Sequence, residues 1–486
     1  MTDRFPMPAL SLAEILDALA PGWFVKGASA IVADQVCVDS RLVQPGALFV
    51  AMAGDRTDGH EYVSSAVAMG AHVCLVERAI AGVPCVDTLK RIAPPELTRG
   101  VCVRVASTLG ALQTLAAHRR QRIGGRVIGV TGSVGKTTAK EAVAAVLSAR
   151  HRVLKSSGNR NNEIGLPLTL MAAEDAYPYI VLEMGMYALG EIADLCRIAR
   201  PDAGLVTNVE PVHLERLGTI ERIARAKAEL VESLPAEGWA ALNADDRRVV
   251  SMAGQTRASI VTFGLQGDAD VQAEGVVERG LDGVSLSVRT SGSVPGGPSK
   301  RTQRMHTRML GRAAVRSALA GITVGLMEGL SWDEIQAGLD DLGQGLRLVT
   351  RPGRHESTIL DDCYNASPTS VSAALQLLRG LKGRRVAVLG DMLELGDQEV
   401  EGHRQIGRVA AESCDILLAM GDRAQMIAAA AIQAGLSESR VLRARDTIEA
   451  VEHLAKLQQR GDVILVKGSR GMQMERIVTE LEEVNE

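Results

Sequence analysis

Apolar and polar positions alternate along the first hundred residues in the rhythm of a small α/β unit. Turn-rich polar segments separate short apolar runs, which predict buried strands at 36–38, 47–51, 73–76 and 101–105. A helical stretch follows at 109–120, and Gly124-Gly125 then interrupts the pattern. We therefore expect a small N-terminal α/β domain over residues 1–106.

The middle of the chain has the pattern of a parallel sheet covered by helices. Largely apolar segments, typical of strands buried on both faces, lie at 127–130, 179–183, 203–208 and 240–243 and predict buried strands. A later β-patterned stretch is interrupted at 291–301 by Gly, Ser and Pro, which predicts a loop in a hairpin-like excursion. We expect a central domain over residues 107–347 with a mononucleotide-binding parallel sheet.

A third alternation of strands and helices begins near residue 351. The predicted strands lie at 358–360, 385–389, 416–420 and 463–466, and each precedes a segment of helical length. No tandem repeat of fixed period is visible, so three different α/β domains in series is the economical interpretation. The third domain is expected over residues 348–486 and to be Rossmann-like.

Composition and charge exclude several classes of protein. The 486 residues are 46% hydrophobic and 23% charged, as in a folded multidomain protein. A net charge of -4 gives no general attraction for nucleic acid, although a local basic cleft could bind a phosphate-bearing small molecule. No apolar run approaches the roughly 20 residues of a membrane span, and the N-terminus does not read as a secretion signal. We expect a cytoplasmic protein without nucleic-acid partners.

The seven cysteines are scattered, odd in number and free of C-x-x-C spacing. This pattern argues against both a disulfide framework and a zinc site. Most of them are expected to be small buried hydrophobic residues. They are Cys37, Cys74, Cys85, Cys102, Cys196, Cys363 and Cys414.

A phosphate-binding loop follows the first predicted strand of the central domain. Glycines let backbone N–H groups converge on a phosphate, Lys136 reaches the outer phosphates, and the Thr137 hydroxyl can bind Mg²⁺. Val130 stands where the general motif has its first glycine. The predicted ATP-binding residues are Thr131, Gly132, Ser133, Val134, Gly135, Lys136, Thr137 and Thr138.

Polar residues stand at the carboxyl ends of the next two predicted strands. Glu183 ends one of them, at the edge where ligands of an open parallel sheet collect, and a carboxylate there suits Mg²⁺. Asn208 ends the next strand, and His213 follows shortly afterwards. A lone histidine is more often structural, but its place near the phosphate site favours a functional role.

Lys227 falls on the apolar stripe of a predicted helix that includes Ile220, Ile223, Leu230 and Leu234. The side chain is therefore expected to point inward. An inward lysine must snorkel, pair with an acid or lose its charge, because isolated burial is costly. The spacing alone favours an ordinary ion pair over a carbamate formed with carbon dioxide.

With these motifs, the chain resembles the Mur ligases of bacterial cell-wall synthesis over nearly its whole length. Thr-Gly-Ser-Val-Gly-Lys-Thr-Thr at 131–138 is similar to the family's own form of the loop, which also lacks the first glycine. Further matching strings lie at 158–167, 183–186 and 208–216 in the central domain, at 39–41, 45–46 and 58–60 before it, and at 361–368, 390–396 and 467–470 after it.

The resemblance implies an ATP-dependent ligase that forms an amide bond through an acyl phosphate. It implies UDP-N-acetylmuramoyl-tripeptide and D-Ala-D-Ala as substrates, ATP and Mg²⁺ as cofactors, and a role in peptidoglycan synthesis. Lys136, His213 and Lys227 are the implied catalytic residues. The implied metal ligands are Thr137, Glu183, His213 and Lys227, the last as a carbamate.

The resemblance also implies binding residues in all three domains of a protein expected to be a monomer. The UDP-substrate would contact Ser40, Arg41, Asp58, His60, Asn161 and Asn162. D-Ala-D-Ala would contact Tyr364, Asn365, Asp391 and Leu395. When the C-terminal domain closes, Arg351 or Arg354 and Asp362 would reach ATP, although either arginine could instead be a surface residue.

The resemblance fails at one place. Family members carry a His-Asn pair and a further Asn that contact adenine, whereas this chain has Ala313, Ala314 and Ser317 there. Weaker nucleotide selectivity, compensation by other residues and an altered protein are all open. The rival functions are a related ligase that adds one amino acid or extends a folate, and a P-loop binding protein that has lost catalysis.

Overall fold

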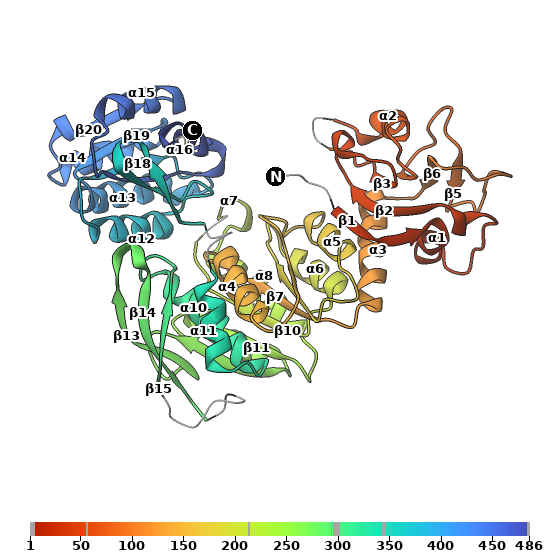
Figure 1. Cartoon of the computed structure of the whole chain (residues 1–486), viewed down its shortest axis with the longest axis horizontal. Coiled ribbons are helices and arrows are strands. Elements are labelled where there is room, and N and C mark those ends of the chain that lie inside the picture. Colours follow the sequence, from red (N-terminus) through yellow and green to blue (C-terminus); the bar gives the residue numbers. More distant parts are fainter. Residues whose placement is uncertain are drawn as a thin grey trace.

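The computed structural model describes residues 5–54, 57–211, 214–292, 294, 302–342 and 347–483. Three α/β lobes follow one another in an arc, with the central lobe between the other two (Figure 1). Each lobe is built on one sheet, and each sheet lies inside one of the predicted domains. The predicted fold class, three α/β domains in series, is confirmed.

The N-terminal sheet has the order β1-β2-β3-β4-β6-β5, in which only β1 runs antiparallel to its neighbour. The sequence pattern did not predict β1 or the short β5. The strands are β1 (Phe5–Ser11), β2 (Val32–Cys37), β3 (Ala47–Val50), β4 (Val73–Val76), β5 (Cys85–Asp87) and β6 (Val101–Arg104), with helices α1 (Leu12–Leu19) and α2 (Val63–Ala68).

Four cysteines form a row across this sheet. Cys37 of β2 pairs in register with Phe49 of β3, and Phe49 pairs with Cys74 of β4. Cys74 in turn pairs with Cys102, which pairs with Cys85. The six cysteines other than Cys85 are buried and all seven are free, as the sequence predicted.

The central sheet has the order β15-β14-β13-β12-β11-β10-β7-β9-β8. The chain crosses from one side of β7 to the other, and such a reversal opens a ligand-binding crevice at the carboxyl ends of the strands. The strands are β7 (Arg126–Thr131), β8 (Val153–Lys155), β9 (Tyr179–Glu183), β10 (Ala203–Val206), β11 (Trp239–Asn243), β12 (Ser259–Gly264), β13 (Val271–Glu278), β14 (Val284–Thr290) and β15 (Thr302–Thr307).

Helices cover this sheet, and its last three strands form an antiparallel extension. The predicted hairpin is present because β14 pairs with β15, while its predicted loop at 291–301 lies mostly outside the described residues. The helices are α3 (Thr108–Arg122), α4 (Lys136–Ser148), α5 (Gly165–Met171), α6 (Glu191–Ala199), α7 (Leu214–Leu217), α8 (Ile220–Glu232), α9 (Arg247–Val250), α10 (Ala314–Met327) and α11 (Trp332–Asp340).

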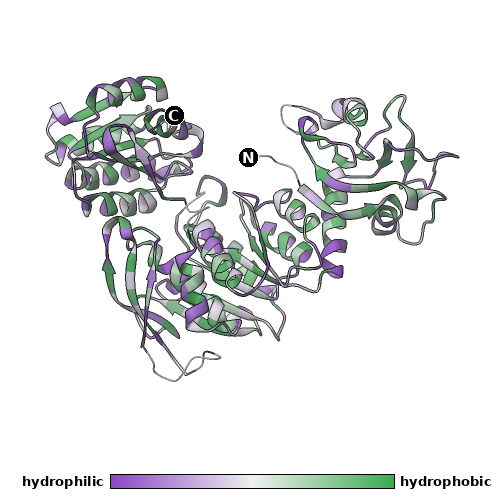
Figure 2. Ribbon diagram, in the orientation of Figure 1, coloured by the Kyte–Doolittle hydropathy of each residue, from purple (hydrophilic) through white to green (hydrophobic). Residues whose placement is uncertain are grey.

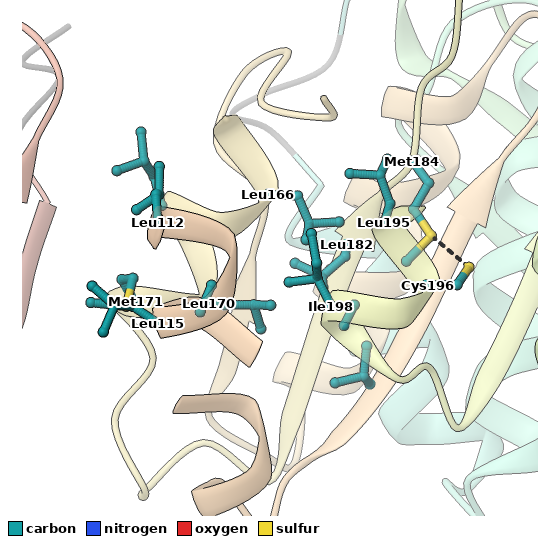
Figure 3. Packing of buried hydrophobic residues seen from close by; sticks show 14 of the residues in the cluster. Leu112, Leu115, Leu166, Leu170, Met171, Leu182, Met184, Leu195, Cys196 and Ile198 are labelled. Atoms are coloured by element: carbon teal, nitrogen blue, oxygen red, sulfur yellow. Dashed lines mark hydrogen bonds between the residues drawn. The ribbon is translucent and has the colours of Figure 1, made fainter. Parts of the chain in front are cut away.

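One hydrophobic core joins the N-terminal and central domains. Leu112 and Leu115 of α3 lie beside Leu170 and Met171 of α5, and α6 packs against both α3 and α5 (Figure 3). The same cluster of buried side chains extends from α1 to α8. Burial of apolar area contributes about 25 cal/mol per Å², so this shared core fixes the N-terminal domain to the central one.

The C-terminal sheet has the order β16-β17-β21-β18-β19-β20, with only β16 antiparallel. Hydrophobic residues run along its strands (Figure 2), which separate two apolar cores. The elements are β16 (Val349–Gly353), β17 (Ser357–Asp361), α12 (Pro368–Arg379), β18 (Arg385–Gly390), α13 (Glu399–Ser413), β19 (Ile416–Met420), α14 (Ala424–Gln433), β20 (Val441–Ala444), α15 (Thr447–Leu457), β21 (Val463–Lys467) and α16 (Glu475–Leu481).

Within the described ranges, no helix is both long enough and apolar enough to span a bilayer.

Candidate active site

The predicted strand, glycine loop and helix are present at the carboxyl end of β7. Gly132 has a φ of +149° and Gly135 a φ of +83°, values that side-chain-bearing residues rarely adopt. A Cβ atom on Gly132 would lie 1.9 Å from Thr207 Oγ1, so this close approach also requires glycine. Lys136 then begins α4, whose N-terminal N–H groups face the loop.

Residues that follow the carboxyl end of β10 hold the phosphate loop in place through side-chain hydrogen bonds. Asn208 Oδ1 accepts from the Val134 N–H at 2.8 Å, and Asn208 Nδ2 donates to the Val134 carbonyl at 3.0 Å. The Thr207 hydroxyl donates to the same carbonyl at 2.8 Å. Ser133 Oγ exchanges hydrogen bonds with the backbone of Glu210. Asn208, which the sequence placed at a strand end, therefore shapes the phosphate loop.

Lys136 is folded over the loop that it follows. Its Nζ donates to the carbonyls of Gly132 at 2.9 Å and Ser133 at 3.1 Å. Burial lowers the pKa of Lys136 to about 8, opposed by the Glu183 carboxylate and assisted by the positive charge of Arg347. A phosphate anion bound at the loop would supply the negative charge that this ammonium group lacks.

Glu183 lies fully buried at the end of β9, one strand away from the loop. The Thr137 hydroxyl donates to Glu183 Oε2 at 2.9 Å, and Asn161 Nδ2 donates to Oε1 at 2.8 Å. Carboxylate and hydroxyl oxygens are the ligands that Mg²⁺ prefers in proteins. Thr137 and Glu183 are thus close enough to share one metal ion, and their chemistry fits it.

A buried lysine supports Glu183 from behind. Lys140 is completely buried, and its Nζ donates to the Ser156 carbonyl at 2.7 Å and lies 3.0 Å from Glu141 Oε1. The Ser156 hydroxyl accepts the N–H of Glu183 at 3.1 Å. Neither Lys140 nor Ser156 was predicted from the sequence, because nothing in the local pattern links α4, the end of β8 and β9.

Lys227 points inward from α8, as predicted, with only 2% of its surface exposed. Burial lowers its pKa well below the ordinary value, and the charge of Lys136 acts in the same direction. Among the described residues, none accepts a hydrogen bond from its Nζ and none forms an ion pair with it, so the favoured ion pair is not found there. His213 lies outside the described residues.

Metal-binding clusters of three or more His, Cys, Asp or Glu side chains are absent from the ranges that the structure describes. The ligand set inferred from the sequence contains one carboxylate, Glu183, with Thr137, Lys227 and the undescribed His213. It therefore remains a prediction.

A cavity of about 360 Å³ lies between the central and C-terminal domains. Residues of the phosphate loop line one side, and residues after β17 and β18 line the other. Lys467 Nζ lies 2.6 Å from Asp362 Oδ2 and donates to the Asn365 carbonyl at 2.9 Å. Burial raises the pKa of Asp362, and Lys467 opposes this shift. Tyr364, Asn365 and Asp362 thus face the loop across the cavity.

Arg347 is a cavity residue that was not predicted from the sequence. Its Nη2 donates to Thr137 Oγ1 at 2.9 Å, and its guanidinium carbon lies 4.3 Å from the centre of the Tyr364 ring. It stands between the two domains, without the periodic or motif signal that marks a site. A charged residue in the domain junction was the only clue.

Arg351 and Arg354, which were predicted to contact ATP, lie outside the cavity. Arg351 forms ion pairs at 2.8 Å with Asp361 and with Glu482, and neither Arg351 nor Arg354 lines the cavity. The Arg354 backbone carbonyl accepts from Gln458. In this arrangement the side chain of Arg351 joins elements of the C-terminal domain, as the surface alternative allowed.

The predicted dipeptide and UDP contacts are only partly gathered at the cavity. Tyr364, Asn365, Leu395 and Asn161 line it, whereas Asp391 instead accepts from the Ala424 N–H at the start of α14. Asn162 Oδ1 accepts from the Gly165 N–H at the start of α5.

The N-terminal candidates form their own hydrogen-bonded group. Asp58 Oδ1 lies 2.6 Å from Nδ1 of buried His60, and Nε2 of His60 accepts from the Glu77 N–H. Hydrogen bonds from the backbone N–H of His60, from its ring and from Arg78 lower the pKa of Asp58. Arg41 is exposed and paired with Asp39, beside Ser40. In the structure, the His60 ring therefore stabilises the local fold, while Ser40 and Arg41 are accessible to solvent.

The segment without the expected amides borders the cavity. Ala313, Ala314 and Ser317 line it at the start of α10, together with Arg316. Arg316 Nε donates to Asp245 Oδ2 at 2.8 Å.

Comparison with protein families gives a match along most of the chain. The Mur ligase family catalytic domain matches residues 33–120, the Mur ligase middle domain residues 130–325, and the Mur ligase glutamate ligase domain residues 346–470. The UDP-N-acetylmuramoyl-tripeptide–D-alanyl-D-alanine ligase of Bacillus subtilis is 36% identical over 452 residues, with 92% of each chain covered.

The enzyme of the same name from Escherichia coli is 34% identical over 491 residues, with 98% of this chain and 99% of that chain covered. Among solved structures, MurF from Acinetobacter baumannii has a TM-score of 0.84 at 30% identity, covering 98% of this chain and 99% of that one. MurF ligase from Thermotoga maritima in complex with ADP has a TM-score of 0.76 at 27% identity, covering 92% and 96%.

Proposed function

Because the chain belongs to the Mur ligase family, we propose that it is the ligase that joins D-alanyl-D-alanine to UDP-N-acetylmuramoyl-tripeptide at the expense of ATP. The product is a precursor of peptidoglycan, made in the cytoplasm and needed for cell shape and division. The observation that carries the proposal is full-length similarity to ligases of this name, combined with a phosphate loop that opens into a cavity between two domains.

In the first step, a carboxylate oxygen of the tripeptide attacks the γ-phosphorus of ATP, and the bond to the β,γ-bridging oxygen breaks. The products are an acyl phosphate and ADP. Lys136 and Arg347 stabilise the charge on the transferring group, since both cations lie at the loop. Thr137 and Glu183 would hold Mg²⁺, which supplies further charge neutralisation when bound.

In the second step, the amine of D-alanyl-D-alanine attacks the acyl carbon, the amide bond forms, and inorganic phosphate leaves. The proton that the amine loses leaves with the inorganic phosphate. Tyr364 and Asn365 lie across the cavity from the loop and orient the dipeptide there. Closure of the C-terminal domain over the cavity would exclude water, which would otherwise hydrolyse the acyl phosphate.

Lys227 is proposed to carry a carbamate that binds a second Mg²⁺ with Glu183 and His213. Support comes from its burial beside Lys136, because burial and the Lys136 charge both lower the pKa of Lys227 and so favour the uncharged, nucleophilic amine. In the ¹³C NMR spectrum of the protein incubated with ¹³C-bicarbonate, a carbamate carbon resonance should appear. The same resonance should be absent from Lys227→Ala. Full activity of that variant would exclude the role.

Substrate binding at the outer domains completes the proposal. Ser40 and Arg41, with the group around Asp58, would bind the UDP end, and the C-terminal domain would close over ATP and dipeptide. The enzyme would act as a monomer, since its site is made within one chain.

Phosphate release from ATP tests the function directly. The assay contains UDP-N-acetylmuramoyl-tripeptide and compares D-alanyl-D-alanine, single amino acids and no amine. We expect release only with the dipeptide, and mass spectrometry should show the pentapeptide product. Release with a single amino acid would favour the rival ligase, and no release under any condition would favour a binding protein.

A further inference from the structure

The cavity has an apolar end that fits the flat ring of a nucleotide base. Phe263 and Met309 belong to the hydrophobic core of the central domain and Leu377 to that of the C-terminal domain, while the partly buried Ala314 and Leu310 pack against these two cores. All five line the cavity where the two cores meet. A base has apolar faces and polar edges, so it is expected to insert its ring between these walls.

This end is connected to the phosphate loop through the start of α10. A Cβ atom on Gly135 would lie 3.8 Å from Ser317 Oγ, which places the first turn of α10 against the loop. A nucleotide whose phosphates occupy the loop therefore has its base near the residues that surround Ala313 and Ala314. Neither alanine offers a side-chain donor or acceptor to the base edge.

Arg316 supplies hydrogen-bond donors at the same place. Its Nε donates to Asp245, a buried carboxylate that also accepts from the Leu265 and Gln266 N–H groups. Asp245 thereby holds the guanidinium in a fixed orientation. Within the described part of the chain, the terminal amino groups of Arg316 have no acceptor, and the side chain is 44% exposed.

Glu210 supplies an acceptor close to that donor. Its backbone is fixed to Ser133 by two hydrogen bonds, and the residue lines the cavity together with Thr369, to which its carboxylate is hydrogen-bonded. Burial raises the pKa of Glu210, while the Thr369 hydroxyl and the Arg316 charge lower it. The guanidinium is thus near enough to influence the carboxylate, and the two groups form a donor and acceptor pair.

We propose that Arg316 and Glu210 recognise the adenine of ATP, in place of an amide side chain. Arg316 donates to N7, an acceptor that adenine and guanine share, and Glu210 accepts from the 6-amino group of adenine. Guanine carries an acceptor oxygen at position 6, which the Glu210 carboxylate would repel. This inference rests on the proposed function only in that ATP is the nucleotide used.

Calorimetric titration of the full chain with ADP and with GDP tests the pair without either acceptor substrate. Wild type should prefer ADP by about tenfold or more, because a well-placed pair contributes about that much discrimination. Glu210→Ala should weaken the binding of ADP and strengthen the binding of GDP, so that the preference for ADP over GDP falls about tenfold. Glu210→Gln keeps the size of the side chain but can donate to a 6-oxygen, so it should gain affinity for GDP.

Arg316→Ala should weaken both nucleotides by a similar factor. The matched control is Arg312→Ala, an exposed arginine one turn earlier that does not line the cavity, and it should leave both affinities unchanged. The proposal would be overturned if the wild-type protein bound ADP and GDP equally well, or if both Glu210 variants kept the wild-type ratio of ADP to GDP affinity. Equal losses of nucleotide affinity in Arg316→Ala and Arg312→Ala would also overturn it. Failure of the ligase assay alone would leave these binding results valid.

Discussion

Replacement of Gly132 by alanine offers a severe test of the phosphate loop. The new Cβ would lie 1.9 Å from Thr207 Oγ1, whereas real Cβ contacts are essentially never shorter than 3.0 Å. The hydroxyl must therefore leave, and its 2.8 Å hydrogen bond to the Val134 carbonyl breaks. The lost bond costs about 1 kcal/mol and the strained φ of +149° about 1–3 kcal/mol.

These terms together come to about 2–4 kcal/mol, which corresponds to a loss of ADP affinity between roughly 30-fold and several hundredfold. Calorimetry with ADP measures the loss, and a thermal melt shows how much of the cost falls on folding instead. Gly124→Ala is the control, since no atom lies within 4 Å of its added Cβ. Thr207→Ala should restore part of the affinity in the Gly132→Ala background.

The reasoning is refuted if Gly132→Ala binds ADP within twofold of wild type and melts at the same temperature. Such a result would mean that the loop adopts another conformation when phosphate binds.

Three further predictions concern charged groups around the loop. The pKa of Lys136 is lowered to about 8, and bound phosphates should raise it, so ADP affinity should fall as pH rises through 8. ADP binding should therefore be accompanied by proton uptake, which calorimetry in buffers of different ionisation enthalpy measures. This proton uptake should disappear in Lys136→Arg. Arg347→Ala should lower kcat/KM for phosphate release by about a hundredfold, as for loss of a transition-state donor, whereas Arg351→Ala, outside the cavity, should change it less than threefold. Lys140→Met leaves the buried Glu141 with one cation fewer and should lower the melting temperature by several degrees. A melting temperature equal to that of the wild-type protein would contradict this prediction.

Features encoded within one stretch of chain could be predicted from the sequence. The strand, glycine loop and helix follow each other directly, so their spacing carries the phosphate site. The inward direction of Lys227 follows from helical periodicity, and its 2% exposure confirms it. The strands Val73–Val76, Tyr179–Glu183 and Ile416–Met420 have the predicted bounds, because each is an apolar run, ended in the second case by Glu183.

Features created by contact between distant segments could not be predicted in this way. Arg347 and Thr137 are 210 positions apart, and their hydrogen bond depends on how two domains meet. Lys140 reads as a solvated helix residue until β8 covers it. His60 carries a motif that suggests ligand binding, yet in the structure its ring bonds Asp58 and Glu77. Local patterns report the chain's own periodicity, whereas these roles depend on tertiary neighbours.

The burial of the native thiols has a practical consequence for measuring domain closure. Six cysteines are buried, and burial raises the pKa of the half-buried Cys85 as well as theirs, so few thiolates form near neutral pH. Maleimide dyes react with thiolates, so a pair of cysteines introduced on exposed faces of the central and C-terminal domains could be labelled selectively in the otherwise unmodified chain. Energy transfer between the two dyes would then follow, in real time, how the lobes approach when nucleotide is added.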